Sequence, residues 1–275
     1  MTLFCSLMST SNHKVTNIFL LSNSNTLFIG KVLMEFPELP STNLFATDLL
    51  SKSKPAEGTA ISASFQTDGR GQIGSKWYGE PGKNLALSII LYPVFLSPVQ
   101  QFFLSQAVAL AVRDWLAETL EKPAHIKWPN DVYIGDLKIG GILIQNSISG
   151  TAMQSSVVGI GINVNQEVFD PSLPNPTSLK IEAGGREFDL KTVRDRLFQH
   201  LEQRYLQLKS GQTEALAAAY REGLYGLGIP GNFQRRDGSV FRGVITGTTL
   251  AGQLCVLDEN GDESTFDLKA IQFIR

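Results

Sequence analysis

A glycine-rich loop stands between two apolar, strand-like runs in residues 65–91, which read FQTDGRGQIGSKWYGEPGKNLALSIIL. Arg70 offers a forked guanidinium that suits phosphate or carboxylate, and Trp77 offers a flat apolar face. The glycines would let backbone N–H groups approach an anion closely: Gly69, Gly71 and Gly74. We interpret the loop as a clamp over a ligand, because contacts with a ligand could offset the entropy lost when the loop orders. A surface hairpin turned by its glycines is the alternative.

The same loop argues against two common nucleotide-binding folds. Its glycines do not match the spacing of a dinucleotide-binding turn, and residues 84–91 have the pattern of a strand rather than a helix. The loop also lacks the GK[ST] sequence of a P-loop. We therefore set aside dehydrogenase and P-loop functions.

A second group of polar residues lies in residues 125–146, which read HIKWPNDVYIGDLKIGGILIQN. Two β-rich runs, 132–134 and 138–145, are joined by Gly135-Asp136, and this pattern predicts a hairpin. The second strand has no side chains at two successive positions, Gly140 and Gly141. This indicates either a β-bulge or the close approach of a ligand. Five residues around this turn could serve a site: Lys127, Trp128, Asn130, Asp131 and Lys138.

Lys138 and Asp131 each allow a structural and a functional interpretation. A lysine at a strand end is usually solvated, but Lys138 could also stand beside developing negative charge. A carboxylate at a turn usually caps the turn, whereas Asp131 could instead act in catalysis or bind a metal. Both interpretations stay open at the level of these residues.

Three ordered motifs, GRGxxGxxW, KWPND and KxxGIL, resemble those of the catalytic domain of bacterial biotin protein ligases. They cover residues 39–165, and KWPND is the specific part. The resemblance implies an α+β fold, with a class II synthetase-like mixed β-sheet flanked by helices and followed by a small SH3-like β-barrel. The expected division is a disordered or misassigned extension at 1–26, a catalytic domain at 27–226 and the barrel at 227–275.

The resemblance also assigns roles to individual residues. The expected biotin-binding residues are Ser41, Thr42, Asn43, Gln66, Gly69, Arg70, Lys138 and Gly141. The expected nucleotide-binding residues are Arg70, Gly71, Trp77, Asn130, Lys138, Gly161 and Asn163. The expected catalytic residues are Arg70, Lys127, Asp131 and Lys138. Without the resemblance, residues 41–43 would be a helix N-cap and residues 157–164 a buried strand.

The chain departs from many of these relatives at two positions of the clamp. Gln72 and Ser75 stand where those relatives carry arginine, so two positive charges are missing. We hypothesise that a weaker positive charge lets the reactive adenylate escape faster than from arginine-rich relatives. Comparable rates of escape would contradict this hypothesis.

The implied reaction has two steps. The carboxylate of biotin attacks the α-phosphorus of ATP and gives biotinyl-5′-AMP, and a lysine of a carrier protein then displaces AMP. The implied acceptor is the biotin carboxyl carrier protein of acetyl-CoA carboxylase. Mg²⁺ is expected to accompany ATP and keep most of its waters, with no dedicated metal site in the protein. The three histidines fit no Ser/His/Asp pattern.

Composition agrees with a cytoplasmic enzyme. The chain has 275 residues, 43% of them hydrophobic, enough to bury a core for one large domain and a small satellite. A net charge of −2 and the lack of a basic cluster predict no nucleic-acid partner, and no run is long enough for a membrane span. The segment before the expected core is too short for a winged-helix DNA-binding domain, so we expect no repressor function. Cys5 and Cys255 are too few for a disulfide framework or a zinc site, and Cys255 is expected to be buried. The expected state is a monomer or homodimer.

The other segments complete the expected fold, and residues 28–36 are expected to form the first strand of the core. Helical spacing predicts helices at 102–120, 190–208 and 214–225, the first with Arg113, Asp114 and Glu118 on its exposed side. About five strands fit into 232–275, with a hairpin turn at Asn260-Gly261.

Two competing functions remain, a lipoate protein ligase and a biotin-binding protein without activity. KWPND argues against the first function. The presence of Arg70, Lys127 and Lys138 argues against the second.

Overall fold

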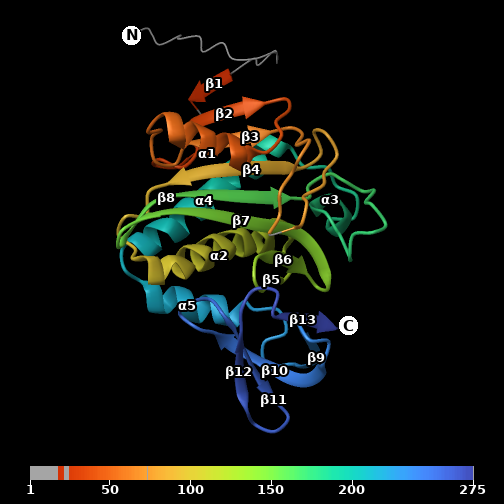
Figure 1. Ribbon diagram of the computed structural model, residues 1–275. Coiled ribbons are helices and arrows are strands. Elements are labelled where there is room, and N and C mark those ends of the chain that lie inside the picture. Colours follow the sequence, from red (N-terminus) through yellow and green to blue (C-terminus); the bar gives the residue numbers. More distant parts are fainter. Residues whose placement is uncertain (1–17, 22–24, 73, 275) are drawn as a thin grey trace.

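The computed structural model describes residues 18–21, 25–72 and 74–274. It contains an eight-stranded sheet and, after it in the chain, a five-stranded sheet that lies below the first in Figure 1. Helices pack on both faces of the large sheet. This arrangement confirms the expected α+β fold with a small C-terminal β domain.

The large sheet has the strand order β1-β2-β3-β4-β8-β7-β6-β5. Strands β2 and β3 are parallel and the other neighbours are antiparallel, so the sheet is mixed. Strand β4 lies in the middle and all of its residues are buried, as its apolar run predicts. The strands are β1 (Ile18–Leu21), β2 (Val32–Phe36), β3 (Ala60–Ala63), β4 (Leu85–Leu91), β5 (Ala124–Lys127), β6 (Asp131–Ile134), β7 (Leu137–Ser149) and β8 (Ala152–Ile162).

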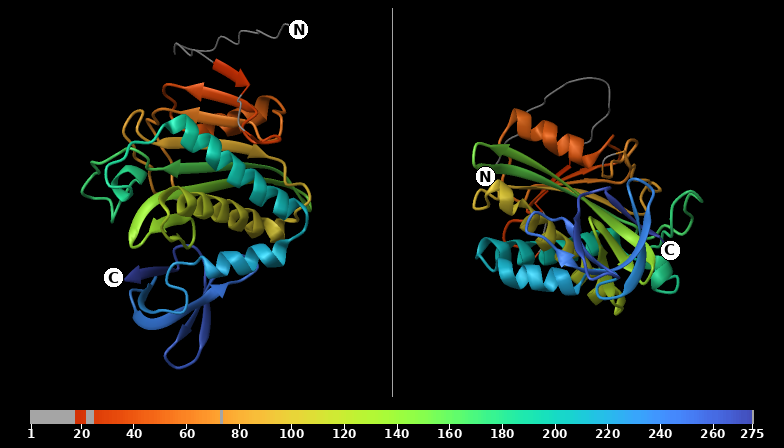
Figure 2. Two further views of the ribbon diagram at one scale, coloured as in Figure 1. Left: turned by 180° about the vertical axis from the view of Figure 1, so that it is seen from behind. Right: turned by 60° about the horizontal axis from the view of Figure 1, so that its bottom comes forward.

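Helices cover the two faces of this sheet unequally. Helices α2 and α4 cross one face diagonally, as the view from behind in Figure 2 shows. Helix α1 lies on the opposite face and packs against β3, β4 and β8, so this face stays less covered over β7 (Figure 1). The helices are α1 (Thr42–Lys52), the 3-10 turn η1 (Pro98–Gln100), α2 (Gln101–Leu120), α3 (Leu179–Glu182), α4 (Leu190–Lys209) and α5 (Thr213–Glu222).

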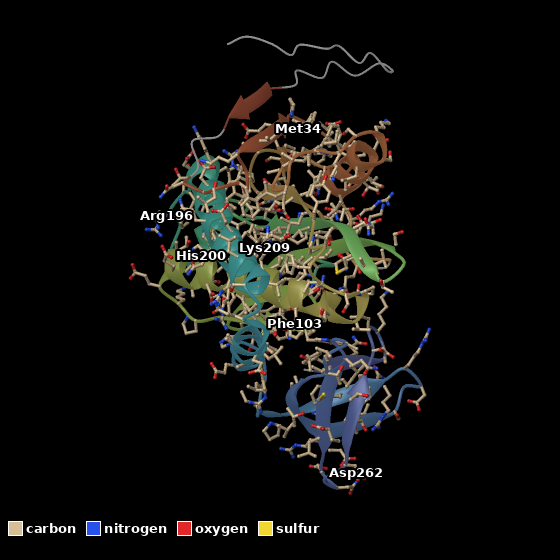
Figure 3. The ribbon with its side chains drawn as sticks, turned by 90° about the vertical axis from the view of Figure 1, so that its left-hand side faces the viewer. Met34, Phe103, Arg196, His200, Lys209 and Asp262 are labelled. Atoms are coloured by element: carbon tan, nitrogen blue, oxygen red, sulfur yellow. The ribbon has the colours of Figure 1, made fainter. Side chains whose placement is uncertain are left out.

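One expectation about the first predicted helix is wrong. Arg113 and Asp114 do not lie on an exposed side of α2, because Arg113 donates to the carbonyl of Ala219 and Asp114 accepts from Arg204 at 2.5 Å. They tie α2 to α5 and α4. Helices α4 and α5 both pack on α2, and α4 also meets the β2 side of the sheet, where Arg194 pairs with Glu35. Figure 3 shows Arg196 and His200 on the outer side of α4.

The N-terminal edge of the sheet also differs from the expectation. Residues 18–21 form β1 and pair antiparallel with β2, although a disordered extension was expected at 1–26. Residues 1–17 and 22–24 lie outside the described residues. The first strand of the predicted core begins at Val32 instead of Phe28, because Glu202 accepts from the backbone N–H groups at 27, 28 and 29 and holds them in a turn.

The C-terminal domain has five antiparallel strands, as expected, in the order β12-β11-β10-β9-β13. Cys255 was expected to be buried but is partly exposed; burial and the nearby Glu263 raise the pKa of its thiol. None of the helices in the described part of the chain has the length and apolarity to cross a bilayer. The strands are β9 (Pro230–Arg235), β10 (Val240–Thr248), β11 (Leu254–Asp258), β12 (Glu263–Phe266) and β13 (Ile271–Ile274).

Direct contacts hold this domain against the large one. The indole Nε1 of Trp128 donates to the carbonyl of Gly252 at 2.9 Å, and Arg221 Nε donates to the carbonyl of Thr246 at 2.7 Å. Gly252 has φ +89°, and a Cβ there would lie 2.5 Å from the ring of Phe102. The glycine therefore lets the turn before β11 press against α2.

Candidate active site

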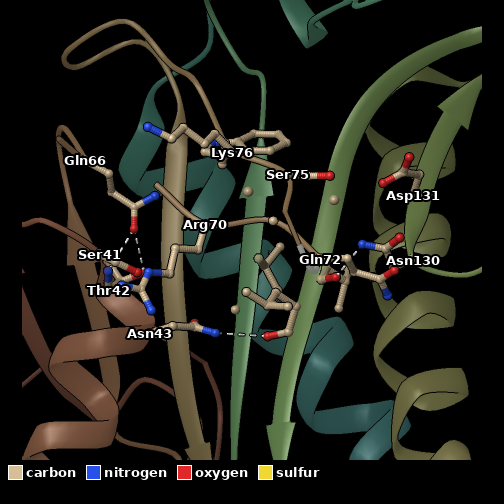
Figure 4. Close-up of a pocket in the computed structure, with 18 of the residues that line it drawn as sticks. Ser41, Thr42, Asn43, Gln66, Arg70, Gln72, Ser75, Lys76, Asn130 and Asp131 are labelled. Atoms are coloured by element: carbon tan, nitrogen blue, oxygen red, sulfur yellow. Dashed lines mark hydrogen bonds between the residues drawn. The ribbon is translucent and has the colours of Figure 1, made fainter. Parts of the chain in front are cut away.

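A cavity of about 180 Å³ opens on the face of the large sheet that carries α1 (Figure 4). The clamp loop, the start of α1 and strands β4, β6, β7 and β8 form its walls, together with one residue of the C-terminal domain. The cavity thus brings together the two groups of residues that the sequence places about fifty positions apart. Its lining includes these predicted site residues: Ser41, Thr42, Asn43, Gln66, Arg70, Gly71, Trp77, Asn130, Asp131, Lys138, Gly141 and Gly161.

One end of the cavity is a network of neutral polar groups at the start of α1. Gln66 Oε1 accepts from the backbone N–H of Thr42 at 2.8 Å and from its hydroxyl at 3.1 Å. Ser88, fully buried in β4, donates to Asn43 Oδ1 at 2.6 Å. Asn43 Nδ2 donates to the carbonyl of Leu143 at 3.1 Å. Such side chains can orient a neutral polar ligand without burying an unpaired charge.

Ser41 occupies the N-cap position of α1, as the local sequence predicts, but its side chain makes no capping hydrogen bond. Ser41 instead lines the cavity. The extended backbone of Ser41 thus begins the helix. Its hydroxyl is left to face the space that a ligand would enter.

Two glycines of β8 allow side chains to rest directly on the sheet. A Cβ at Gly161 would lie 2.5 Å from the indole of Trp77, and a Cβ at Gly159 would lie 2.3 Å from Asn43 Oδ1. Any larger residue would push Trp77 or Asn43 away from its place in the cavity wall. The bare glycines of the GIGIN segment thus set the floor of the site.

The clamp loop is folded as a narrow hairpin over the cavity. Its backbone pairs at Arg70 and Lys76, Gly71 N–H donates to Ser75 O at 3.0 Å, and Trp77 N–H donates to Gly69 O at 2.9 Å. The two interpretations of this loop are therefore compatible, because a glycine-turned hairpin supplies the residues that line the cavity. In Figure 4, the Arg70 side chain runs from the clamp toward Ser41 and Thr42, while Asn130 and Asp131 lie on the other side of the cavity.

The opposite wall comes from the KWPND turn and β7. Lys138 Nζ lies 2.6 Å from Asp131 Oδ1, and both side chains are about three-quarters buried. Asn130 Nδ2 donates to the carbonyl of Ile142 at 2.9 Å and fixes the turn to β7. The register between β6 and β7 shifts between Val132 and Tyr133, which marks a β-bulge. The bulge lies in the same strands that line the cavity, so the structural and the functional interpretation of this segment are compatible.

Three of the residues to which the resemblance assigns a role do not line this cavity. Lys127 points its ammonium at three aromatic rings, 4.8 Å from the centroid of Tyr133, 5.1 Å from Phe273 and 5.7 Å from Tyr225. Asn163 is buried and donates to the carbonyl of Thr177 at 2.9 Å, which supports a neighbouring loop. The third, Gly69, packs against the backbone of the clamp.

The structure adds residues to the lining that the sequence did not assign to binding or catalysis. The aliphatic residues among them stand within apolar strand patterns, which hide any role at a site. Lys269 comes from the C-terminal domain and carries no local signal at all. The additional lining residues are Gln72, Ser75, Lys76, Leu87, Ile142, Leu143, Gly159, Ile160 and Lys269. Within the described residues, no three His, Cys, Asp or Glu side chains gather as they would around a resident metal ion.

Known proteins with related sequences and folds agree with this arrangement. Residues 35–163 match the model of the biotin/lipoate A/B protein ligase family. The chain is 30% identical over 240 residues to the bifunctional ligase/repressor BirA of Bacillus subtilis, covering 86% of this chain and 72% of the relative. It is 32% identical over 228 residues to the biotin–[acetyl-CoA-carboxylase] ligase of Mycobacterium tuberculosis, covering 80% and 81%.

A solved structure, the biotin protein ligase of Aquifex aeolicus in complex with biotin and ATP, superposes with a TM-score of 0.72 at 27% identity. The match covers 88% of this chain and 98% of that chain, so it includes both the large sheet and the C-terminal domain. Sequence, fold and site geometry point the same way. The chain belongs to the biotin/lipoate A/B protein ligase family and, within it, to the biotin protein ligases.

Proposed function

We propose that the protein activates biotin with ATP and transfers the biotinyl group to a lysine of the biotin carboxyl carrier protein of acetyl-CoA carboxylase. One observation carries this proposal: Arg70 and Lys138, from separate segments, line a single cavity together with the neutral polar network at the start of α1. The network suits the ureido ring of biotin, and the cations suit a carboxylate that meets a phosphate. Relatives named as biotin ligases support the same chemistry.

In the first step a carboxylate oxygen of biotin attacks the α-phosphorus of ATP, and the bond to the leaving pyrophosphate breaks. The product is biotinyl-5′-AMP. Arg70 and Lys138 would offset the negative charge that gathers where the two anions meet. Trp77, held on Gly161, would give the adenine a flat apolar surface. The protein thus acts mainly by positioning and by neutralising charge.

Mg²⁺ would enter with ATP as part of the substrate. It prefers phosphate oxygens and water with one or two carboxylates, and Asp131 is the carboxylate in the described lining. The donor set therefore fits a metal carried by the nucleotide rather than one held by the protein. Such a metal would neutralise phosphate charge.

In the second step the amine of the acceptor lysine attacks the carbonyl carbon of the mixed anhydride. An amide bond forms, the bond to the phosphate oxygen breaks, and AMP leaves. The amine loses a proton, which Asp131 is placed to accept. This route needs no covalent intermediate on the enzyme.

The test is to incubate the protein with ATP, Mg²⁺, a carrier domain and either biotin or lipoate, and to weigh the carrier. We expect a mass gain of one biotinyl group with biotin and no gain with lipoate. A carrier whose target lysine is replaced by arginine serves as the control. Transfer of lipoate, or of neither acid, would contradict the proposal.

We propose a cytoplasmic location, because ATP and a carboxylase acceptor are both available there. We expect no nucleic-acid partner, because the net charge is −2 and the sequence has no basic cluster. A sequence-specific DNA footprint at physiological salt would contradict that expectation. A monomer or a homodimer remains our proposal for the assembly.

A further inference from the structure

The C-terminal domain contributes one side chain to the cavity, that of Lys269. Lys269 stands in the connection between β12 and β13, almost two hundred residues beyond the clamp loop. Its ammonium lies 3.7 Å from the position that a Cβ on Gly74 would occupy, at the tip of the clamp. A cation of the small domain therefore meets the loop that covers the site.

The backbone at Lys269 has an uncommon conformation. Its φ is +62°, in the left-handed region that glycine adopts without cost and other residues enter seldom. The turn is closed by the Ala270 N–H, which donates to the carbonyl of Asp267 at 3.0 Å. A glycine would relieve this conformation and lose the ammonium. Residues held in such conformations cluster at functional sites.

Contacts from the KWPND segment set the position of the domain that carries Lys269. Trp128 donates to the carbonyl of Gly252, and Lys127 lies over the ring of Phe273 in β13. Asn130 and Asp131, only a few residues further along the chain, line the cavity. One short segment therefore forms a wall of the cavity and also seats the domain that reaches into it.

The charge around the cavity gives a reason for this arrangement. Arg70 lies 3.6 Å from Asp68, and Lys138 lies 2.6 Å from Asp131, so carboxylates of the protein partly neutralise both cations. The clamp itself contributes the neutral side chains of Gln72 and Ser75 to the lining. A triphosphate carries more negative charge than this pair of cations can balance. Further positive charge in the described lining comes from Lys76 and Lys269.

We propose that Lys269 binds the phosphates of the nucleotide and, by reaching over the tip of the clamp, keeps the adenylate in the cavity. This inference rests on the proposed ligase function and adds a role for the C-terminal domain in the same site. Lys269 supplies from a second domain the positive charge that the clamp lacks at positions 72 and 75. A covered adenylate would also be protected from water.

The test compares three substitutions at this position. Lys269→Gln removes the charge, Lys269→Gly removes the charge and relieves the backbone, and Lys269→Arg keeps the charge. Arg236→Gln is the matched control, because Arg236 is an exposed cation of the same domain and does not line the cavity. The readouts are KM for ATP, KM for biotin, the rate of pyrophosphate release without acceptor, and the midpoint of thermal unfolding.

We expect the Gln and Gly variants to raise KM for ATP about three- to tenfold, in the range of a charged contact with phosphate. Pyrophosphate release without acceptor should rise relative to transfer, because escaped adenylate frees the enzyme for another cycle. KM for biotin should stay within about twofold. Lys269→Arg should restore both properties, and Lys269→Gly should unfold at the same or a higher temperature than the wild type.

Unchanged KM for ATP and unchanged adenylate escape in both uncharged variants would overturn the inference. Equal changes in Arg236→Gln would also overturn it, because they would reflect net charge instead of a contact. A wild-type protein that forms no adenylate from biotin and ATP would instead defeat the proposed function. If the wild type is active but the uncharged Lys269 variants change neither KM for ATP nor adenylate escape, the inference about Lys269 is wrong and the proposed function stands.

Discussion

The ammonium of Lys138 lies 2.6 Å from the carboxylate of Asp131, and the two side chains face the cavity from neighbouring strands. Each group is partly shielded from water, so each holds the other in place more firmly than an exposed pair would. The pair sets where the ammonium stands before any substrate enters. This geometry gives the first prediction.

Lys138→Gln should lower the rate of adenylate formation by about a hundredfold or more, because a charge at the reacting centre is lost. Asp131→Asn should lower it by about tenfold through misplacement of the ammonium. The double variant should be little worse than Lys138→Gln alone, since the two residues act as a unit. Single-turnover release of pyrophosphate measures all three rates. Fully additive losses would show that the pair has no common role.

The glycines of β8 should separate binding of biotin from binding of ATP. Gly159→Ala drives a methyl group into Asn43, so it should raise KM for biotin about tenfold or more and KM for ATP much less. Gly161→Ala drives a methyl group into Trp77, so it should mainly raise KM for ATP. Steady-state kinetics with each substrate varied in turn measure the two effects.

Gly231→Ala is the control for these strand glycines, because its Cβ would make only ordinary contacts, at 3.8 Å from Phe233 in the C-terminal domain. We expect both KM values of this variant within about twofold of the wild type. If Gly159→Ala and Gly161→Ala shift the same KM by the same factor, the cavity is not divided into a biotin part at Asn43 and a nucleotide part at Trp77.

Lys127 should behave as a residue that seats the C-terminal domain. Lys127→Met keeps an apolar stem among Tyr133, Tyr225 and Phe273 but loses the attraction of a cation to these rings, which is worth about 0.5 to 1 kcal/mol at partly exposed sites. The variant should unfold at a lower temperature and lose less than about tenfold in the rate of adenylate formation. A loss as large as that of Lys138→Gln would restore a catalytic role for Lys127.

Asp189 should make stability depend on pH at the start of α4. Its carboxylate accepts from the hydroxyl of Thr192 at 2.6 Å and from the backbone N–H at 2.8 Å, and these bonds lower its pKa. A carboxyl whose pKa is lower in the folded state stabilises the fold above its ordinary pKa, and this stabilisation disappears as the pH falls through the folded pKa.

Asp189→Asn keeps a capping side chain that does not titrate in this range. The difference in unfolding midpoint between wild type and Asp189→Asn should therefore shrink as the pH is lowered from 6 toward 3. Thermal unfolding followed by circular dichroism measures it. A difference that stays constant over this range would mean that the carboxylate contributes no titrating stabilisation.

Local patterns in the sequence were sufficient for much of the fold. The spacing of apolar residues predicts α2 and α4 within one residue at each end, because a helix that packs on a sheet must repeat its apolar face. The glycine turns likewise predict the five C-terminal strands. The start of the first core strand was wrong, because Glu202, which lies more than 170 residues away, fixes the backbone before Val32.

The motifs, through their resemblance to biotin protein ligases, determined the family and most of the residues of the cavity, because the glycines, cations and small polar groups of that family stand in the same order along this chain. The tertiary structure decided which charges meet. It places Lys138 beside Asp131, turns Lys127 away into an aromatic cage, and brings Lys269 to the clamp from another domain. Side-chain direction and contacts between distant segments depend on the packing of whole domains, and no short stretch of sequence records that packing.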